Sequence, residues 1–199
     1  SASKDWARLV EVILRIAELV SDPTQLAKYY ITAGSITSRE LGRLGEAAEY
    51  YEQAVEHDAT LPKGFEGLVR CLKQKADWER LEDAYREHIL RIDKTGTPEE
   101  KVEVWDELGD LLQNRLDRKT DAIEAFEAAQ ELDPENRRRT ELLAEVYTAD
   151  PKKHYTKAVV THGQLLRLDP YRAESYQSLR ALYTGMKRAD ESWCLCQAL

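Results

Sequence analysis

Histidine and cysteine are the residues of this chain best suited to bind a metal or to act as nucleophiles. None of the four histidines lies four residues from another with a glutamate between them, as a zinc-binding helix requires. Cys194 and Cys196 would point about 200° apart on a helix, so they suit neither a shared metal site nor a mutual disulfide. The sequence also lacks a glycine-rich phosphate loop and a nucleophile elbow. We therefore predict no catalytic residue, no metal site and no cofactor, and hence no enzyme.

Charge and hydropathy narrow the choice of partners. The chain has 37 Asp and Glu against 29 Lys and Arg, a net charge of −8 that would repel a phosphate backbone, so we expect no nucleic-acid partner. The densest basic run, Arg137 to Arg139, is interpreted as a solvated face or as paired with nearby acids such as Glu135. No apolar run is long enough to cross a bilayer and no signal peptide opens the sequence. We expect a cytoplasmic protein without membrane insertion.

The composition is that of a helical protein. Only 9 Gly and 6 Pro occur in 199 residues, and 33% of the residues are charged. Asp22-Pro23 and Thr97-Pro98 each place a capping side chain before a proline at the first helical position. We therefore expect an all-α fold without a sheet. The expected helices are residues 5–20, 23–41, 44–57, 62–75, 77–93, 98–115, 119–132, 136–148, 153–168, 171–186 and 188–199.

The sequence repeats itself. DWARL at residues 5–9 returns as DWERL at residues 77–81, an offset of 72. Further along, matching residues recur at an offset of 75. They are Pro23 and Pro98, Gly34 and Gly109, Leu41 and Leu116, Ala47 and Ala122, Tyr51 and Phe126, and Ala54 and Ala129. Each such block contains two similar halves of roughly 34 to 38 residues, a period typical of stacked helical hairpins.

Within this period the sequence resembles the tetratricopeptide repeat. That family's pattern has a large residue, Leu-Gly and an aromatic residue on the first helix of a hairpin, and Ala, an aromatic residue, Ala and Pro on the second. The clearest match consists of Trp105, Leu108, Gly109 and Leu112, followed by Ala122, Phe126, Ala129 and Pro134. The resemblance implies a right-handed α-solenoid of antiparallel helix hairpins with about 11 helices, from a bacterial-type multi-repeat array. It also places His162 at an aromatic core position, where we expect it to pack.

The repeat register predicts the domain organisation. We expect one solenoid domain over residues 1–199, and its parts are a partial unit at 1–20 and units at about 22–59, 61–94, 98–134, 137–170 and 172–199. Trp6 begins a second-type helix, meaning the second helix of a hairpin, with no first-type helix before it. The chain also stops within another second-type helix, at SWCLCQAL. We therefore predict a fragment of a longer array whose apolar ends could pair with another copy.

The resemblance also predicts a binding groove. In this family the first-type helices line a concave surface, and one face of each contacts the ligand. The residues carried over to that face are Lys28, Lys63, Arg70, Lys73, Glu103, Asp106, Asp110, Arg138, Glu141 and Glu145, with Ile31, Ser35 and Glu66 beside them. The groove would be basic toward the N-terminal side and acidic in the middle, which would steer and orient a peptide of the opposite charge order. The same residues also fit an ordinary solvated face.

These observations favour a non-catalytic scaffold for protein–protein interaction that binds a peptide or protein partner in its concave groove. The alternative is a self-assembly or spacer module of a larger multi-repeat protein, with homodimerisation through the exposed solenoid ends. The acidic positions in the third unit argue against the clamp of Lys and Asn with which some tetratricopeptide proteins hold a partner's C-terminal carboxylate.

Overall fold

The computed structural model describes residues 2–94 and 96–187, with only the backbone of residues 2 and 3. Over these two ranges the chain forms ten α-helices and no strand, which confirms the all-helical prediction. The expected helix at 188–199, which contains Trp193, Cys194 and Cys196, lies outside the described residues. The helices are Ala2–Ala17 (α1), Pro23–Arg39 (α2), Leu44–His57 (α3), Pro62–Lys75 (α4), Trp78–Ile92 (α5), Pro98–Asn114 (α6), Lys119–Leu132 (α7), Arg137–Ala149 (α8), Pro151–Leu168 (α9) and Ala173–Gly185 (α10).

Local capping and turn chemistry set the helix ends. The carboxylate of Asp22 accepts a hydrogen bond from the backbone N–H of Gln25 at 3.0 Å, so the predicted cap of α2 is present. The first helix ends at Ala17, three residues before the predicted end, because Leu19 and Val20 donate to carbonyls three residues back and tighten the chain into a turn. The predicted start at residue 153 was also late, since α9 begins at Pro151 and bends at His154, whose backbone is not helical.

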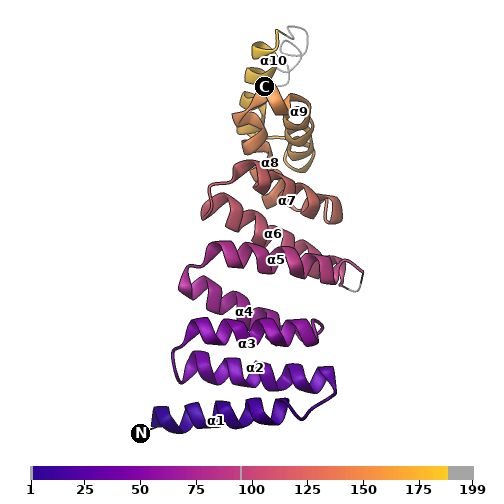
Figure 1. Ribbon diagram of the computed structural model, residues 1–199. Helices are drawn as coiled ribbons and strands as arrows, with labels where there is room; N and C mark the ends of the chain where they lie inside the picture. The colour runs from indigo at the N-terminus through magenta and orange to yellow at the C-terminus, as the bar shows by residue number, and fades with distance from the viewer. Residues whose placement is uncertain (1, 95, 188–199) are drawn as a thin grey trace. The chain divides into compact units, whose positions relative to one another are not determined.

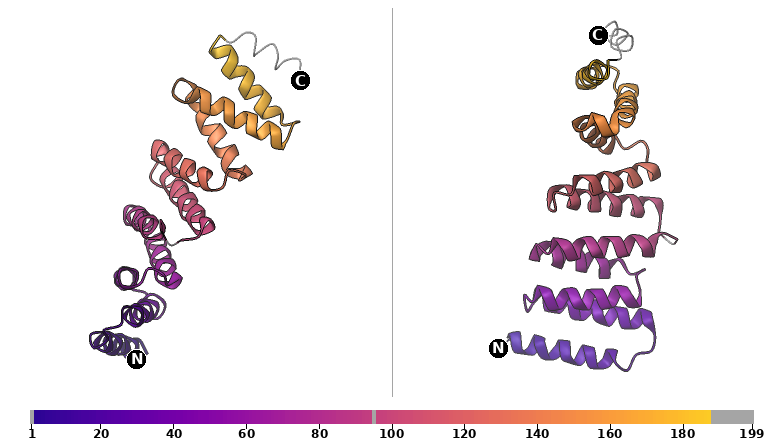
Figure 2. Two further views of the ribbon diagram at one scale, coloured as in Figure 1. Left: turned by 90° about the vertical axis from the view of Figure 1, so that its right-hand side faces the viewer. Right: turned by 45° about the horizontal axis from the view of Figure 1, so that its top comes forward.

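By its internal contacts the chain divides into two compact units. Unit 1 comprises residues 1–97 and 110–117, and unit 2 comprises residues 98–109 and 118–199. In unit 1, α1 packs on α2, α2 on α3, α3 on α4 and α4 on α5, while α2 also touches α4 (Figure 1). In unit 2, α7 packs on α8, α8 on α9 and α9 on α10, neighbours that Figure 2 shows from two further sides. The predicted repeat boundaries remain a prediction.

One tyrosine ring joins three helices in the core of unit 1. Tyr51 of α3 is almost fully buried, and its ring lies against Gly34 of α2 and Gly67 of α4. A Cβ on Gly34 would lie 3.1 Å from the Tyr51 ring, and one on Gly67 would lie 2.3 Å from it. The two glycines therefore leave the space that the ring fills, which gives close packing without a void.

The same arrangement recurs in unit 2 with a phenylalanine. Phe126 of α7 is buried against Gly109 of α6, and a Cβ on that glycine would lie 2.6 Å from the ring. In the repeat register, Phe126 and Gly109 are the counterparts of Tyr51 and Gly34. The ladder of matching residues in the sequence thus corresponds to a repeated packing contact between a first-type and a second-type helix.

Candidate functional site

Four exposed cations lie on the neighbouring first-type helices of unit 1. Lys28 is on α2, and Lys63, Arg70 and Lys73 are on α4; we call these four residues the basic face. The two helices touch each other, and the three cations of α4 were predicted to share a face because their spacing follows the turns of a helix. Glu66 is an exposed acid between them on the same helix.

Contacts beneath the basic face help to hold it in place. Arg70 points its guanidinium toward the hydroxyl of Tyr51, with 3.5 Å between Nη2 and Oη.

Within the part of the chain that the structure describes, Lys28 and Lys63 form no ion pair. Hydrogen bonds from Thr60 and Thr24 lower the pKa of Asp58, and the charge of Lys28 adds a smaller effect. Lys28 and Lys63 are therefore available to an acidic partner.

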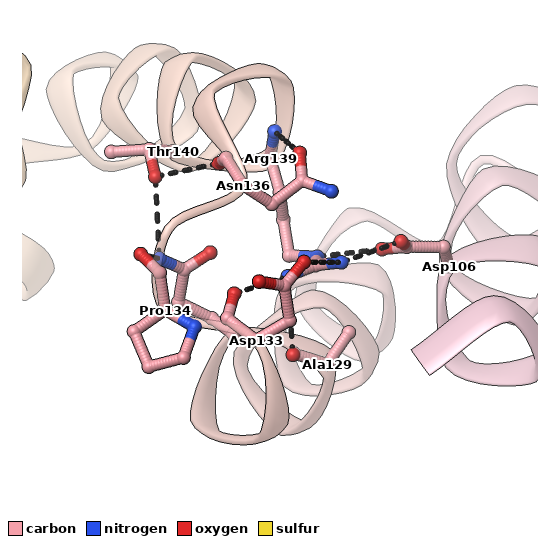
Figure 3. Close-up of polar contacts among 8 residues, drawn as sticks. Asp106, Ala129, Asp133, Pro134, Asn136, Arg139 and Thr140 are labelled. Atoms are coloured by element: carbon pink, nitrogen blue, oxygen red, sulfur yellow. Dashed lines mark hydrogen bonds and ion pairs between the residues drawn. The ribbon is translucent and has the colours of Figure 1, made fainter. Parts of the chain in front are cut away.

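Asp106, predicted for the acidic part of the groove, instead pairs with a buried arginine (Figure 3). Arg139 of α8 donates from Nε and Nη2 to the two carboxylate oxygens of Asp106 at 2.8 and 2.7 Å. This is the bidentate geometry that makes an arginine–carboxylate pair strong. The side chain of Arg139 is only 2% exposed, whereas that of Asp106 is 33% exposed.

Arg139 also binds the end of α7. Its Nη1 donates to the backbone carbonyls of Ala129 and Asp133 at 3.1 and 2.8 Å, groups near a helix C-terminus that need partners outside the helix. Asn136 caps α8 by accepting from the backbone N–H of Arg139 at 3.1 Å. One guanidinium thus connects α6, α7 and α8 within unit 2.

The solvated-face interpretation of the basic run was therefore wrong for Arg139, and its acid partner is not Glu135. Arg139 pairs with Asp106 and lies 3.7 Å from the Asp133 carboxylate, because three residues after the cap its side chain points into the hairpin contact. Arg137 pairs with Glu141 at 2.9 Å. Arg138, the remaining member of the run, is exposed.

The repeat register contains a signal for this buried arginine. Gly64 and Ile31 occupy the positions of unit 1 that correspond to Arg139 and Asp106. That pair of positions is also in contact in unit 1, since the Cδ1 atom of Ile31 lies 3.8 Å from the place of a Cβ on Gly64. The repeat therefore replaces a contact between glycine and isoleucine with an ion pair at the equivalent place in unit 2.

Glu141, another predicted groove residue, also has arginine partners. It accepts from Arg172, which precedes α10, at 2.6 Å and from Arg137 at 2.9 Å. The hydrogen bond from Arg137 and the charge of Arg172 hold the pKa of Glu141 below its usual value. This carboxylate links α8 to the start of α10.

The remaining predicted groove residues are divided between the two units. Glu103 and Glu145 are exposed in unit 2, and Asp110 is partly buried, belongs to unit 1 and has a polar partner. The acids predicted for one continuous stretch of groove are therefore not equivalent. Two of them stabilise hairpin contacts, and of the acids predicted on α6 and α8 only Glu103 and Glu145 are exposed.

His162 occupies the core of unit 2, as predicted. Its Nε2 lies 2.9 Å from Thr148 Oγ1, whose own hydrogen is donated to the carbonyl of Ala144. The geometry therefore favours the tautomer with hydrogen on Nε2, and leaves Nδ1 to accept from the hydroxyl of Ser175 at 3.3 Å. Burial, assisted by the charge of Arg172, lowers the pKa of His162.

This histidine predicts an acid-sensitive stability. Because its pKa is lower in the folded chain than the usual value of about 6.5, the unfolded chain binds a proton first as the pH falls. The free energy of unfolding of the native chain should therefore decline, relative to a His162→Gln variant, as the pH drops from about 6.5 through the lower folded pKa. Urea unfolding at a series of pH values measures this difference, and parallel curves for the two proteins would contradict it.

Among the described residues there is neither a metal-binding cluster nor a membrane-spanning helix. No group of three or more His, Cys, Asp or Glu side chains is arranged to hold a metal ion there. None of the ten described helices is both long enough and apolar enough to cross a bilayer.

Comparison with known proteins agrees with this geometry. The sequence model of the family described as Tetratricopeptide repeat matches residues 27–60 and 102–136. The chain is thus an α-helical repeat protein, and two of its segments match the tetratricopeptide repeat. No curated protein sequence matches it.

Solved structures of tetratricopeptide-repeat proteins share its fold at low sequence identity. YrrB, described as a tetratricopeptide-repeat protein with an unusual peptide-binding site, is 16% identical, with 95% of this chain and 91% of YrrB covered and a TM-score of 0.53. MamA is 20% identical, with 86% and 88% covered and a TM-score of 0.51. A tetratricopeptide repeat protein from Parabacteroides merdae is 15% identical, with 98% and 72% covered and a TM-score of 0.50.

Proposed function

We propose that this chain is a non-catalytic scaffold for protein–protein interaction, and that its basic face binds an acidic segment of a peptide or protein partner. Tetratricopeptide repeats support the scaffold role. A protein of the same fold, YrrB, has a peptide-binding site. The observation that carries the proposal is the cluster of exposed cations on α2 and α4 in a chain whose net charge is −8.

The charge distribution supports this choice of partner. Lys28, Lys63 and Arg70 are exposed on two helices that touch, so a single extended segment can reach all three. Exposed charges contribute modestly to affinity, but together they raise the association rate and fix the orientation of the partner. In unit 2 the carboxylates of Asp106 and Glu141 already have arginine partners, which leaves less negative charge for a basic peptide.

We expect a fluorescein-labelled Glu-rich peptide to bind the native chain with an affinity that falls as salt is raised. Reversing three charges, with Lys28→Glu, Lys63→Glu and Arg70→Glu together, should raise the Kd about tenfold or more, equivalent to at least about 1.4 kcal/mol. Fluorescence polarisation measures the Kd. The three positions are exposed, so circular dichroism should show unchanged helicity.

A matched variant separates a site from the effect of net charge. Lys119→Glu, Lys152→Glu and Lys153→Glu change the total charge by the same amount at exposed positions in unit 2. This variant should bind the peptide nearly as well as the native chain. Equal weakening by both variants would show that the peptide responds only to overall charge, and would overturn the proposal.

Self-assembly is the second candidate function, and one observation favours it. Leu9 and Ile16 of α1 are exposed, whereas their repeat counterparts on α5, Leu81 and His88, are buried. The outer side of α1 is thus an apolar surface of the kind through which proteins associate. Sedimentation equilibrium of the native chain and of a Leu9→Lys, Ile16→Lys variant distinguishes self-assembly from the binding of a separate partner. The cytoplasmic location and the absence of nucleic-acid partners remain predictions.

A further inference from the structure

A second surface feature lies in unit 2, on the side of the second-type helices. It is a cleft of about 430 Å³ between α7 and α9, with α8 beneath it. Its volume is within the range of about 300–1,000 Å³ that small-ligand sites occupy. Its lining includes Glu127, Glu131, Leu143, Tyr147, Lys157 and Val160.

An equivalent cleft exists in unit 1. It measures about 270 Å³ and lies between α3 and α5, above Leu68 of α4. In the repeat register, Leu68 corresponds to Leu143 and Glu52 corresponds to Glu127. An ion pair spans each cleft, from Arg80 to Glu52 at 2.7 Å in unit 1 and from Lys157 to Glu127 at 2.5 Å in unit 2. The repeat therefore builds the same kind of cleft twice.

The walls of the two clefts differ in polarity. In unit 1 the α5 side carries Asp83, Glu87 and Arg91. On α9 the register shifts to an offset of 77, which aligns Leu81 with Ala158 and Tyr85 with His162. At that offset the counterparts of the three charged residues are Val160, Gln164 and Leu168. Val160 lines the unit 2 cleft and is 54% exposed, and Leu168 further along the helix is also exposed. Beyond Lys157, the charged positions of the α5 wall are thus replaced on α9 by uncharged side chains, two of them apolar and open to solvent, which indicates a contact surface.

The opposite wall of the unit 2 cleft is acidic. Glu127 accepts from both Lys157 and the hydroxyl of Tyr147 at 2.5 Å. Burial alone would raise the pKa of Glu127, but these two hydrogen bonds outweigh burial and lower it, so the carboxylate stays ionised and paired. Glu131, one helical turn further along α7, is exposed and pairs with no other described residue. It presents an uncompensated negative charge at the edge of the cleft.

We propose that this cleft binds a peptide segment that places an aliphatic side chain against Val160 and a lysine or arginine beside Glu131. The aliphatic group would cover the exposed valine, and the cation would complement the carboxylate across the cleft. The site goes beyond the basic face of unit 1, because it lies on other helices and selects the opposite charge. A scaffold with both sites would hold two chemically different segments.

Labelled peptides that differ at two positions test the site directly. One probe carries Leu followed by Lys in a Gly-Ser background, and the two comparison probes replace Lys by Glu or Leu by Gly. We expect fluorescence polarisation to show that the native chain prefers the Leu-Lys probe severalfold over both others. Val160→Asp, at an exposed position, should weaken binding of that probe about tenfold, since it puts a charge where the aliphatic group would pack.

A variant that reverses the preference between the Leu-Lys and Leu-Glu probes tests the site more stringently than a loss of binding does. Glu131→Lys should invert the order, so that the Leu-Glu probe binds better than the Leu-Lys probe. Glu56→Lys makes the same change at the equivalent position of unit 1 and should leave the order unaltered. Equal binding of all probes by the native chain, or an unchanged order in the Glu131→Lys variant, would overturn the proposal. Neither result depends on the Glu-rich peptide that tests the basic face.

Discussion

Replacing Arg139 with methionine is expected to lower the free energy of unfolding of unit 2 by about 3–5 kcal/mol, the usual cost of removing one partner of a buried ion pair. The substitution removes a bidentate pair with Asp106 and leaves the carbonyls of Ala129 and Asp133 without their donor. Because the Asp106 side chain is one-third exposed, water can solvate part of its charge, and we expect the lower part of this range.

Denaturant unfolding followed by circular dichroism measures the loss, and hydrogen exchange in α7 and α8 assigns it to unit 2. The neighbouring Arg138→Met is the matched control, because Arg138 is exposed and its replacement should change stability by less than about 0.5 kcal/mol. If the two variants lost equal stability, the buried network would not be what connects α6, α7 and α8.

Replacing Tyr51 with alanine is expected to destabilise unit 1 by about 3–5 kcal/mol, the range for truncating a buried aromatic ring. The ring fills the space beside Gly34 and Gly67, and no side chain on either glycine is present to collapse into the void. Denaturant unfolding of the variant measures the effect.

Two further variants separate packing from other causes. Tyr51→Phe keeps the ring and loses only the 3.5 Å contact between the hydroxyl and Arg70, so it should cost less than about 1 kcal/mol. Tyr171→Ala removes a ring that is 94% exposed and should be nearly neutral. A Tyr51→Ala loss no greater than that of Tyr171→Ala would contradict the packing account.

Much of the fold followed from the sequence because the repeat constrains it. The predicted bounds of α3, α4 and α7 agree with the structure residue for residue. The pairing of Tyr51 with Phe126 and of Gly34 with Gly109 in the sequence corresponds to real contacts between aromatic rings and glycines. Such positions are predictable because large and small residues must alternate wherever helices approach closely.

The candidate site was less predictable, for a physical reason. Helical periodicity places Asp106 and Glu141 on a given face, but it does not reveal whether a cation from another helix neutralises them. That depends on Arg139 and Arg172, which come from later in the chain and act across hairpins. The sequence did not predict the cleft beside Val160, because the family resemblance places ligand contacts on the first-type helices, whereas Val160 lies on a second-type helix.

We propose that an acidic segment binds the basic face of unit 1. The most direct test is a titration of the isotope-labelled chain with the Glu-rich peptide, followed in two-dimensional ¹H–¹⁵N spectra. We predict that the shifted amide signals cluster at Lys28, Lys63 and Arg70 and at their neighbours on α2 and α4. Shifts confined to unit 2, or scattered evenly over the exposed cations of both units, would contradict the account.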